Sequence, residues 1–246
     1  VDKDNYFRTQ YGPQPLEHGL MTIGQVIKYA AGTGLVALAA GTYLVAQRGQ
    51  ITLTLFLVGI FFVLFYTWPL KYIGMGEPAV LVVWGPLMVG GTYYVVAGRF
   101  DWQVVLASLP FALGATAVLF GKHIDKLEAD RAKRIRTLPV LLGERLSRAT
   151  TVVMLLAQYA LVVALVVTHY FSPVLLLVLG ALPALRLALK AYASRRPKEP
   201  PPELPPNVWP LWFVAFAFHH TRRFGVLYVL GLVGDVVIRK LGLVGP

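Results

Sequence analysis

Residues 102–122 read WQVVLASLPFALGATAVLFGK, and no charged residue interrupts them before Lys122. A helix needs about 20 mostly apolar residues to cross the hydrocarbon core of a bilayer. Inside lipid the backbone must also satisfy its own hydrogen bonds, which a helix does. This run therefore predicts a transmembrane helix, and the charged stretch that follows it places the helix end at the membrane surface.

Comparable apolar runs occupy most of the remaining chain. They cover residues 24–47, 51–69, 78–98, 148–169, 172–193 and 223–241. Hydrophobic residues make up 57% of the 246 residues and charged residues only 14%, whereas soluble domains carry about 25% charged residues. We expect an all-α membrane protein, a bundle of seven transmembrane helices that forms a single domain over residues 1–246.

The basic residues are distributed unevenly between the two sides of this bundle. When the runs are threaded alternately through a membrane, one side holds Lys3, Arg8, Lys71, the dense stretch 122–148, Arg195, Arg196, Lys198, Arg222 and Arg223. The other side holds Arg48, Arg99, Arg239 and Lys240. The positive-inside rule predicts a multi-pass protein of the cell (inner) membrane with the basic loops in the cytoplasm.

The net charge of +11 has the same explanation. We attribute it to membrane orientation, to membrane lipid and to an anionic substrate, and expect no nucleic acid partner. The chain has no cysteine, which excludes disulfides, thiolate catalysis and cysteine-based metal sites.

Two basic loops are too long to be simple connectors. The first covers residues 122–147 and the second covers residues 194–222. Within the second loop, residues 209–218 are rich in aromatic side chains but too few for a span, and they predict an interfacial or re-entrant segment. His219 and His220 next to it are expected to be polar residues of the membrane interface.

The stretch 121–139 contains a dense cluster of charged side chains that could take part in catalysis or binding. Its carboxylates, Asp125, Glu128 and Asp130, lie within six residues and are surrounded by lysine and arginine. Carboxylates at a membrane surface suit Mg²⁺, which also binds phosphate oxygens, and the adjacent cations suit the same phosphates. A solvated loop with internal salt bridges would show the same charge pattern.

Two further segments complete the motif set. One holds Asp4, Arg8 and the sequence Pro-Leu-Glu-His-Gly at 15–19. The other, 66–77, places Lys71 among Tyr66, Trp68 and Tyr72. A single lysine just beyond a membrane span usually serves to orient the protein in the membrane, and aromatic residues at this position usually form a belt at the membrane interface.

Together these segments resemble the UbiA-type intramembrane prenyltransferases. The family's first motif, Asn-Asp-x-x-Asp-x-x-x-Asp followed by Pro-Leu-x-x-Gly, would end at Asp4 and continue at 15–19. Its second motif, Asp-x-x-x-Asp with a basic stretch and Thr-Leu-Pro, matches Asp130, Arg131, Lys133 and 137–139. The resemblance implies nine spans, so that seven after Asp4 would leave two missing upstream and the chain N-terminally incomplete.

One position departs from the family pattern. When the second motif is aligned on Asp130, the family's other aspartate falls on Lys126, and Asp125 is one residue early. Two alternatives follow. Either Asp125 takes the metal after a small change in helical winding, or Lys126 binds phosphate while Glu128 assists.

Within the family, the chain looks most like the 1,4-dihydroxy-2-naphthoate polyprenyltransferases of menaquinone synthesis. The resemblance lies in Tyr66-Thr67, in the pattern Pro-Leu-Lys-Tyr-x-Gly-x-Gly-Glu at 69–77, in Gly85-Pro86 and in Gly-Thr-Tyr-Tyr at 91–94. It implies Mg²⁺-dependent transfer of a prenyl group from a polyprenyl diphosphate to an aromatic acceptor, in the synthesis of a menaquinone-like quinone or a related lipid.

The resemblance also implies roles for individual residues. Asp4, Asp125 and Asp130 would be catalytic and, with Glu128, would bind metal; Arg8, Lys71, Lys126, Arg131 and Lys133 would hold the diphosphate. Tyr66, Trp68, Tyr72, Tyr93, Tyr94 and His123 would line the acceptor pocket or stabilise a carbocation, since aromatic faces attract cations.

Three alternatives remain open at this point. Transfer to a different acceptor would use the same motifs, and the unusual 122–126 stretch, Lys-His-Ile-Asp-Lys, could mark it. A membrane transporter would also use intramembrane charge, although no inverted repeat is visible. A scaffold that binds a partner through the proline-rich stretch 195–202 would not need the carboxylates.

Asp235, inside the last apolar run, is expected to lie near the helix end or to be paired.

Overall fold

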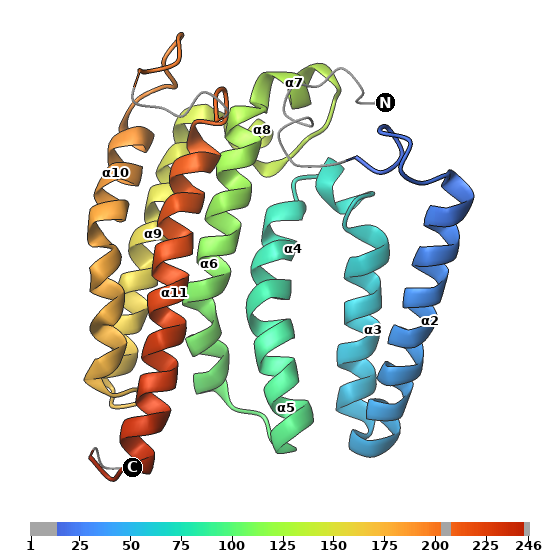
Figure 1. Cartoon of the computed structure of the whole chain (residues 1–246), viewed down its shortest axis with the longest axis vertical. Helices are drawn as coiled ribbons and strands as arrows, with labels where there is room; N and C mark the ends of the chain where they lie inside the picture. Colours follow the sequence, from blue (N-terminus) through green and yellow to red (C-terminus); the bar gives the residue numbers. More distant parts are fainter. Residues whose placement is uncertain (1–13, 203–207, 244–246) are drawn as a thin grey trace.

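The computed structural model describes residues 14–202 and 208–243, and this part of the chain is helical, with one isolated bridge as its only β-type pairing. The helices stand side by side in a bundle (Figure 1). In chain order they are α2 (Ile23–Arg48), α3 (Gln50–Phe65), η1 (Leu70–Tyr72), α4 (Gly76–Val82), η2 (Val83–Gly90), α5 (Gly91–Ala97), α6 (Trp102–Asp125), α7 (Leu127–Ala132), α8 (Leu138–Leu142), α9 (Glu144–Val167), η3 (Pro173–Ala181), α10 (Leu182–Ala193) and α11 (Phe213–Lys240). The all-α prediction is confirmed for the described residues.

Each of the seven predicted apolar runs forms a helix or a continuous helical stack. Five of them are long and apolar enough to cross a membrane: 23–48, 76–97, 102–125, 144–167 and 173–193. The helix α3 has only 16 residues, and the 28-residue α11 carries more charge in its sequence than the other runs. The predicted count of seven membrane spans is therefore not confirmed by helix length and composition.

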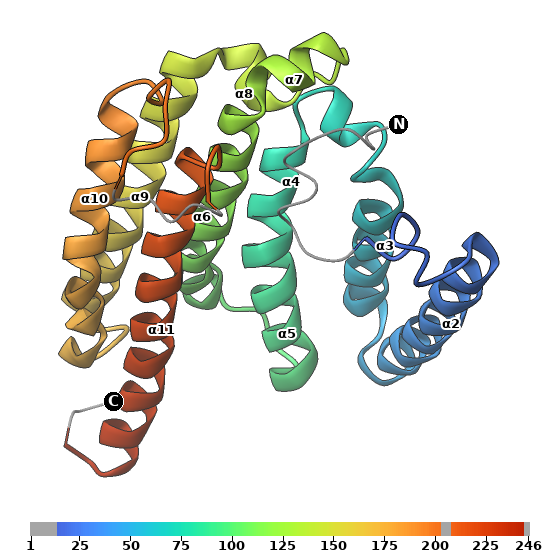
Figure 2. The ribbon, with the colours of Figure 1, turned by 45° about the horizontal axis from the view of Figure 1, so that its top comes forward.

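The core of the bundle joins α6, α9, η3, α10 and α11. Large apolar side chains such as Leu155, Val162, Leu175 and Phe224 are buried between these helices. Small residues allow the backbones to approach where lipid provides no apolar driving force between helices. By contrast, α2 has no buried residue and lies outermost, next to α3 (Figure 2).

The last helix begins earlier than the sequence predicted. Residues 213–218 open α11 and form no separate interfacial or re-entrant piece, so that prediction was wrong. The physical reason is tertiary packing: Phe213, Val214 and Ala217 are buried against neighbouring helices. His220 consequently lies inside the bundle, fully buried, with its Nε2 atom 2.9 Å from the Tyr159 hydroxyl. The predicted interface position is thus wrong for His220, whereas His219 is exposed and its interface position stays a prediction.

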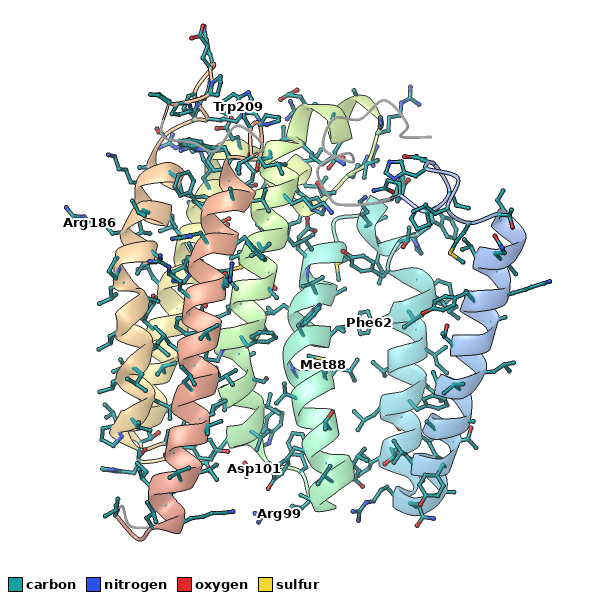
Figure 3. The ribbon with its side chains drawn as sticks, in the orientation of Figure 1. Phe62, Met88, Arg99, Asp101, Arg186 and Trp209 are labelled. Atoms are coloured by element: carbon teal, nitrogen blue, oxygen red, sulfur yellow. The ribbon has the colours of Figure 1, made fainter. Side chains whose placement is uncertain are left out.

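The two ends of the bundle differ in character. The η1 segment, α7, α8 and the link that includes Trp209 gather at one end, whereas Arg99 and Asp101 mark the other (Figures 1 and 3). At that second end Asp235 accepts a hydrogen bond from the Ser172 amide at 2.6 Å and another from Arg239 Nε at 3.0 Å. The expectation that Asp235 is paired is confirmed, and the pair fixes the end of α11 to the start of η3.

The packing around Gly121 leads to a stability prediction. A Cβ atom at Gly121 in α6 would lie 2.8 Å from the Val214 nitrogen and 2.9 Å from the Phe213 carbonyl carbon. These are backbone atoms of α11, which cannot move without shifting the helix. We expect Gly121→Ala to destabilise the protein by about 1–3 kcal/mol, visible as a Tm that is about 2–10 °C lower in detergent.

Gly225 in α11 offers a matched control. A Cβ atom there meets nothing within 4 Å and the backbone is helical, so Gly225→Ala should leave Tm unchanged or raise it slightly. Equal Tm values for the two variants would contradict the close contact between α6 and α11.

Candidate functional site

Two loops meet at the end of the bundle that carries α7 and α8. Ile73, which follows η1, pairs with Arg136 in the isolated parallel bridge. Gly74 adopts a positive φ of 77°, so the turn favours glycine, and its Cα side faces the flexible end of the Leu141 side chain. These contacts place the 66–77 segment against the 136–141 segment.

A buried hydrogen-bonded pair of side chains holds this junction. Glu77 in α4 and His123 in α6 are 1% and 3% exposed, and Glu77 Oε1 lies 2.6 Å from His123 Nδ1. The second carboxylate oxygen of Glu77 accepts the amide of Leu138 at 3.2 Å. One carboxylate thus ties together α4, α6 and the Thr-Leu-Pro segment 137–139, and buried charges require such partners.

Glu77 is the site residue that the sequence did not single out. It entered the sequence analysis only as the last letter of the 69–77 motif, and His123 only as a pocket residue. A signal was present nonetheless, because a carboxylate at the very start of an apolar run is costly unless it is paired.

Asp130 lies close to this pair and is itself buried, with 3% of its surface exposed. Its Oδ2 atom has no hydrogen-bond partner among the described residues. Burial raises the pKa of Asp130 above its ordinary value, while the nearby charges of His123, Lys126 and Lys71 act in the opposite direction. The site therefore presents one unpartnered carboxylate oxygen surrounded by cationic side chains.

Asp125 has a different environment. Its two carboxylate oxygens accept the backbone amides of Phe213 and Val214, each at 3.0 Å, and Arg196 approaches to 3.9 Å. Asp125 thus satisfies the free amides at the N-terminus of α11, as N-cap residues do. Of the two alternatives for the second motif, this arrangement disfavours Asp125 as a metal ligand, and we withdraw it from the proposed ligand and catalytic sets.

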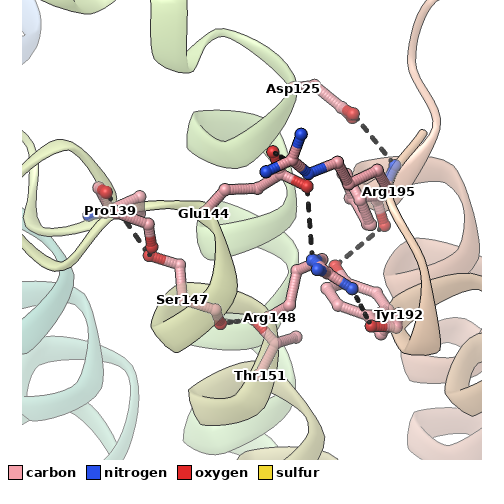
Figure 4. Close-up of polar contacts among 10 residues, drawn as sticks. Asp125, Pro139, Glu144, Ser147, Arg148, Thr151, Tyr192 and Arg195 are labelled. Atoms are coloured by element: carbon pink, nitrogen blue, oxygen red, sulfur yellow. Dashed lines mark hydrogen bonds and ion pairs between the residues drawn. The ribbon is translucent and has the colours of Figure 1, made fainter. Parts of the chain in front are cut away.

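The neighbourhood of Asp125 is a polar network that joins helices (Figure 4). Arg148 in α9 donates to the Tyr192 carbonyl of α10 at 2.9 Å and pairs with Glu144 at 3.3 Å. Ser147 donates to the Gly143 carbonyl at 2.8 Å and approaches the Pro139 carbonyl at 3.4 Å. These contacts anchor the segment after Asp130 to the core and give this region a structural role.

The remaining charged residues of the second motif face outward. The Glu128 side chain is 80% exposed and pairs with Arg131 at 3.0 Å, one helical turn along α7. Lys133 is also exposed. Such surface pairs contribute little to stability. Their placement disfavours Glu128 as a direct metal ligand beside Asp130, although Arg131 and Lys133 remain at the same end of the bundle.

The predicted aromatic residues fall into two groups. Tyr66 lies at the site, where burial and the Glu77 carboxylate raise the pKa of its hydroxyl. Trp68 and Tyr72 occupy the same loop but are exposed. Tyr93 and Tyr94 belong to α5 at the opposite end of the bundle (Figure 1). At 1.5 Å per residue, helical rise separates Tyr93 from Glu77 by about 24 Å, so these two tyrosines do not face the charged cluster, and we withdraw their predicted role.

The described residues fit a magnesium ion only in part. No group of three histidine or carboxylate side chains able to hold a metal occurs within residues 14–202 and 208–243. Asp4 and Arg8 lie outside the described residues. Mg²⁺ commonly binds one or two carboxylates together with substrate phosphates and water, and Asp130, whose Oδ2 atom has no hydrogen-bond partner among the described residues, would be one such carboxylate.

The raised pKa of Asp130 has a consequence for stability. A carboxyl group that binds its proton more readily in the folded state loses stability as pH rises from the ordinary value near 3.8 through the folded pKa. We expect Asp130→Asn to remove this loss, so the variant should have a higher Tm than the parent at pH 7 and a smaller difference at pH 4.5. A lower Tm for Asp130→Asn at pH 7 would show that the attraction of the surrounding cations outweighs the burial that raises the pKa of this carboxyl.

The contacts of Asp125 generate a separate prediction. Asp125→Ala leaves two buried amides of α11 without an acceptor, which costs about 1–3 kcal/mol, and we expect a lower Tm in detergent. Glu128→Ala serves as the control, because an exposed surface substitution changes stability by no more than about 0.5 kcal/mol. If Asp125→Ala left Tm unchanged while abolishing diphosphate binding, the metal-ligand assignment would be restored.

Comparison with known proteins identifies the family of this chain. The model of the UbiA prenyltransferase family matches residues 1–204. A 2-carboxy-1,4-naphthoquinone phytyltransferase of Synechocystis is 27% identical over 61% of this chain and 50% of its own length. The 1,4-dihydroxy-2-naphthoate octaprenyltransferases of Haemophilus influenzae and Bacillus subtilis are 33% and 25% identical, over 53% and 73% of this chain and 43% and 58% of their own lengths.

These alignments are partial, since the chain spans about half the length of the curated relatives it matches. No solved structure matches the chain. The family model nevertheless covers well over half of the chain, including both predicted motifs. The chain belongs to the UbiA prenyltransferase family.

Proposed function

We propose that this protein transfers a prenyl group from a polyprenyl diphosphate to an aromatic acceptor of the naphthoquinone type. The observation that carries the proposal is Asp130, a buried carboxylate with a free oxygen among Lys71, Lys126 and His123 at one end of an apolar bundle. Family membership supports the same chemistry, as do the relatives named as a 2-carboxy-1,4-naphthoquinone phytyltransferase and a 1,4-dihydroxy-2-naphthoate octaprenyltransferase.

The charged cluster would act on the leaving group. When the bond between the prenyl carbon and the diphosphate oxygen breaks, negative charge develops on the diphosphate. Preorganised cations at that position stabilise this charge as it forms, and Lys71, Lys126, Arg131 and Lys133 lie at the correct end of the bundle. Mg²⁺, when bound through Asp130 and the aspartates near Asp4, would supply further neutralisation of the phosphate oxygens.

The apolar bundle would serve the other half of the reaction. An allylic carbocation must be kept from water until the electron-rich ring of the acceptor attacks it and loses a proton. Tyr66 would attract this cation with its ring face, and the rise in its hydroxyl pKa through burial and the Glu77 carboxylate supports a position near that residue. The Glu77–His123 pair would keep α4 and the 137–139 segment in register around this position.

The proposal includes an orientation. Five helices are apolar enough to cross a membrane, and the basic segments 122–148 and 195–198 lie at the same end as Asp130. By the positive-inside rule this end would face the cytoplasm in a cell (inner) membrane. The diphosphate would then bind from the aqueous side while the prenyl tail extends into the bundle or the lipid.

A transfer assay tests the proposal. The full-length protein in detergent is given a radiolabelled polyprenyl diphosphate, Mg²⁺ and a panel of aromatic acceptors that includes 1,4-dihydroxy-2-naphthoate. We expect a prenylated product with the naphthoate and a rate at least about 100-fold lower for Asp130→Asn, as is typical when one group that acts on developing charge is lost.

Glu128→Gln is the matched control, since this exposed carboxylate lies two residues away on the outer face of α7 and should leave the rate within a factor of about two. Product only with a different acceptor in the panel would change the substrate and keep the reaction. No product with any acceptor would remove the enzyme proposal and favour a transporter.

A further inference from the structure

Three arginines of the last two helices have no role in the charged cluster around Asp130. Arg186 belongs to α10, and Arg222 and Arg223 belong to α11. The sequence assigned Arg222 to the second basic loop, whereas the structure starts α11 at Phe213 and so places both of its arginines well within a helix. All three arginine side chains are exposed.

The depth of these arginines follows from the contacts and lengths of the helices. Thr221, which precedes Arg222, donates from its hydroxyl to the Gly114 carbonyl at 3.3 Å. Gly114 stands near the middle of α6, a helix long and apolar enough to cross a membrane, and helical rise puts it about 16 Å from Asp125 at the charged end. Arg186 lies about two helical turns before the end of α10. The arginines therefore lie at levels where the bundle is expected to meet hydrocarbon.

Their side chains point outward from the packed core. The buried positions of α11, among them Phe224, share one face of the helix, whereas Arg222 and Arg223 belong to the opposite, exposed face. Apolar side chains accompany them on that face, among them Val226 with 55% of its surface exposed. Figure 3 shows the Arg186 side chain pointing away from α10 and from the rest of the bundle.

No carboxylate in the described part of the chain forms an ion pair with these arginines. The α10 helix contains no acidic residue, and Asp235 of α11 is already bonded at the far end of its helix. His219, one helical turn earlier, interacts electrostatically with both arginines of α11 and supplies no anion. Cationic side chains within a bilayer are paired or reach its interface, so an anion from outside the described residues is needed here.

The phosphate of an anionic lipid matches this surface. A guanidinium group binds phosphate through two parallel N–H···O bonds and keeps its charge in an apolar medium. Its long apolar stem lets the charged end rise toward the interface, and local thinning of the bilayer brings headgroups inward. Basic groups between membrane helices bind acidic phospholipid headgroups in this way. A zwitterionic lipid offers the same phosphate with a quaternary ammonium group, which arginines repel.

We propose that the outer face of α10 and α11 binds anionic phospholipids, with Arg186, Arg222 and Arg223 holding the headgroup phosphates. The two helices pack against each other, since the Tyr192 hydroxyl of α10 donates to the Phe213 carbonyl of α11 at 3.0 Å. Their arginines therefore meet the same leaflet of the membrane. Lipid binding at this face is independent of the prenyl transfer proposed above.

Native mass spectrometry of the full-length protein in detergent measures its affinity for single lipids. The protein is titrated with dioleoylphosphatidylglycerol and, in parallel, with dioleoylphosphatidylcholine, which has the same acyl chains and no net charge. We expect the parent to bind phosphatidylglycerol at least about tenfold more tightly, because each guanidinium supplies charge-assisted hydrogen bonds. A variant with Arg186→Gln, Arg222→Gln and Arg223→Gln should lose this preference.

A variant with Arg99→Gln, Arg134→Gln and Arg145→Gln is the matched control. It loses the same amount of positive charge from exposed positions in loops or at the start of α9. Because exposed surface charges contribute little, its preference for phosphatidylglycerol should stay within a factor of about three of the parent's. Replacing all three proposed arginines by lysine keeps the charge without the planar fork and should give tighter binding than the glutamine variant.

The outcomes separate a lipid site from other occupants of this face. Equal affinity of the parent for the two lipids, or an unchanged preference in the glutamine variant, would overturn the lipid site. Glycerol 3-phosphate bound as tightly as phosphatidylglycerol would also overturn it, since that compound has no acyl chains. A parent dimer without lipid preference that dissociates in the glutamine variant would assign the face to a second copy. If that variant does not fold, Arg186→Gln and Arg222→Gln decide singly.

Discussion

The architecture of the site depends on one buried contact, the 2.6 Å pair between Glu77 and His123. Both side chains lie in helices that an apolar medium surrounds, where an unpaired carboxylate would be expelled or neutralised. By pairing with His123 and accepting the Leu138 amide, Glu77 can sit at the start of α4 and still be buried. The same contact fixes the height of α4 against α6, and with it the position of Lys71 relative to Asp130.

A second carboxylate performs a similar task at the other side of α6. Asp125 and Asp130 are five residues apart, and their roles diverge because α6 ends between them. Asp125 closes the last turn of α6 and faces the start of α11, whereas Asp130 follows the break at Lys126 and faces η1. Within one acidic motif, Asp125 thus caps the start of α11 and Asp130 is a candidate site residue. The break in the helix between them allows the two side chains to face different neighbours.

The sequence predicted what depends on local pattern and left out what depends on tertiary contacts. Apolar runs of about 20 residues located the seven long helices or helical stacks but not η1, α7 and α8, and Asp130 and Lys71 were placed at one end because motif and charge agreed. The early start of α11, the burial of His220 and the capping role of Asp125 all require knowing which helix packs against which. Glu77 escaped notice for the same reason, since its partner lies 46 positions away. The predicted role of Tyr93 and Tyr94 failed because their motif lies one helix length from the charged loop.

The substitution at Lys126 shows how a motif can change its chemistry while the fold stays the same. A carboxylate at this position would add negative charge beside Asp130 and require a cation to balance it, whereas lysine supplies the balancing charge itself. Lys71, Lys122 and Lys126 all interact electrostatically with Asp130, so lysine at position 126 adds positive charge where a carboxylate would add negative charge. The bundle needs no rearrangement for this change, since Lys126 lies at a helix junction where its side chain can be exchanged without altering the packed core.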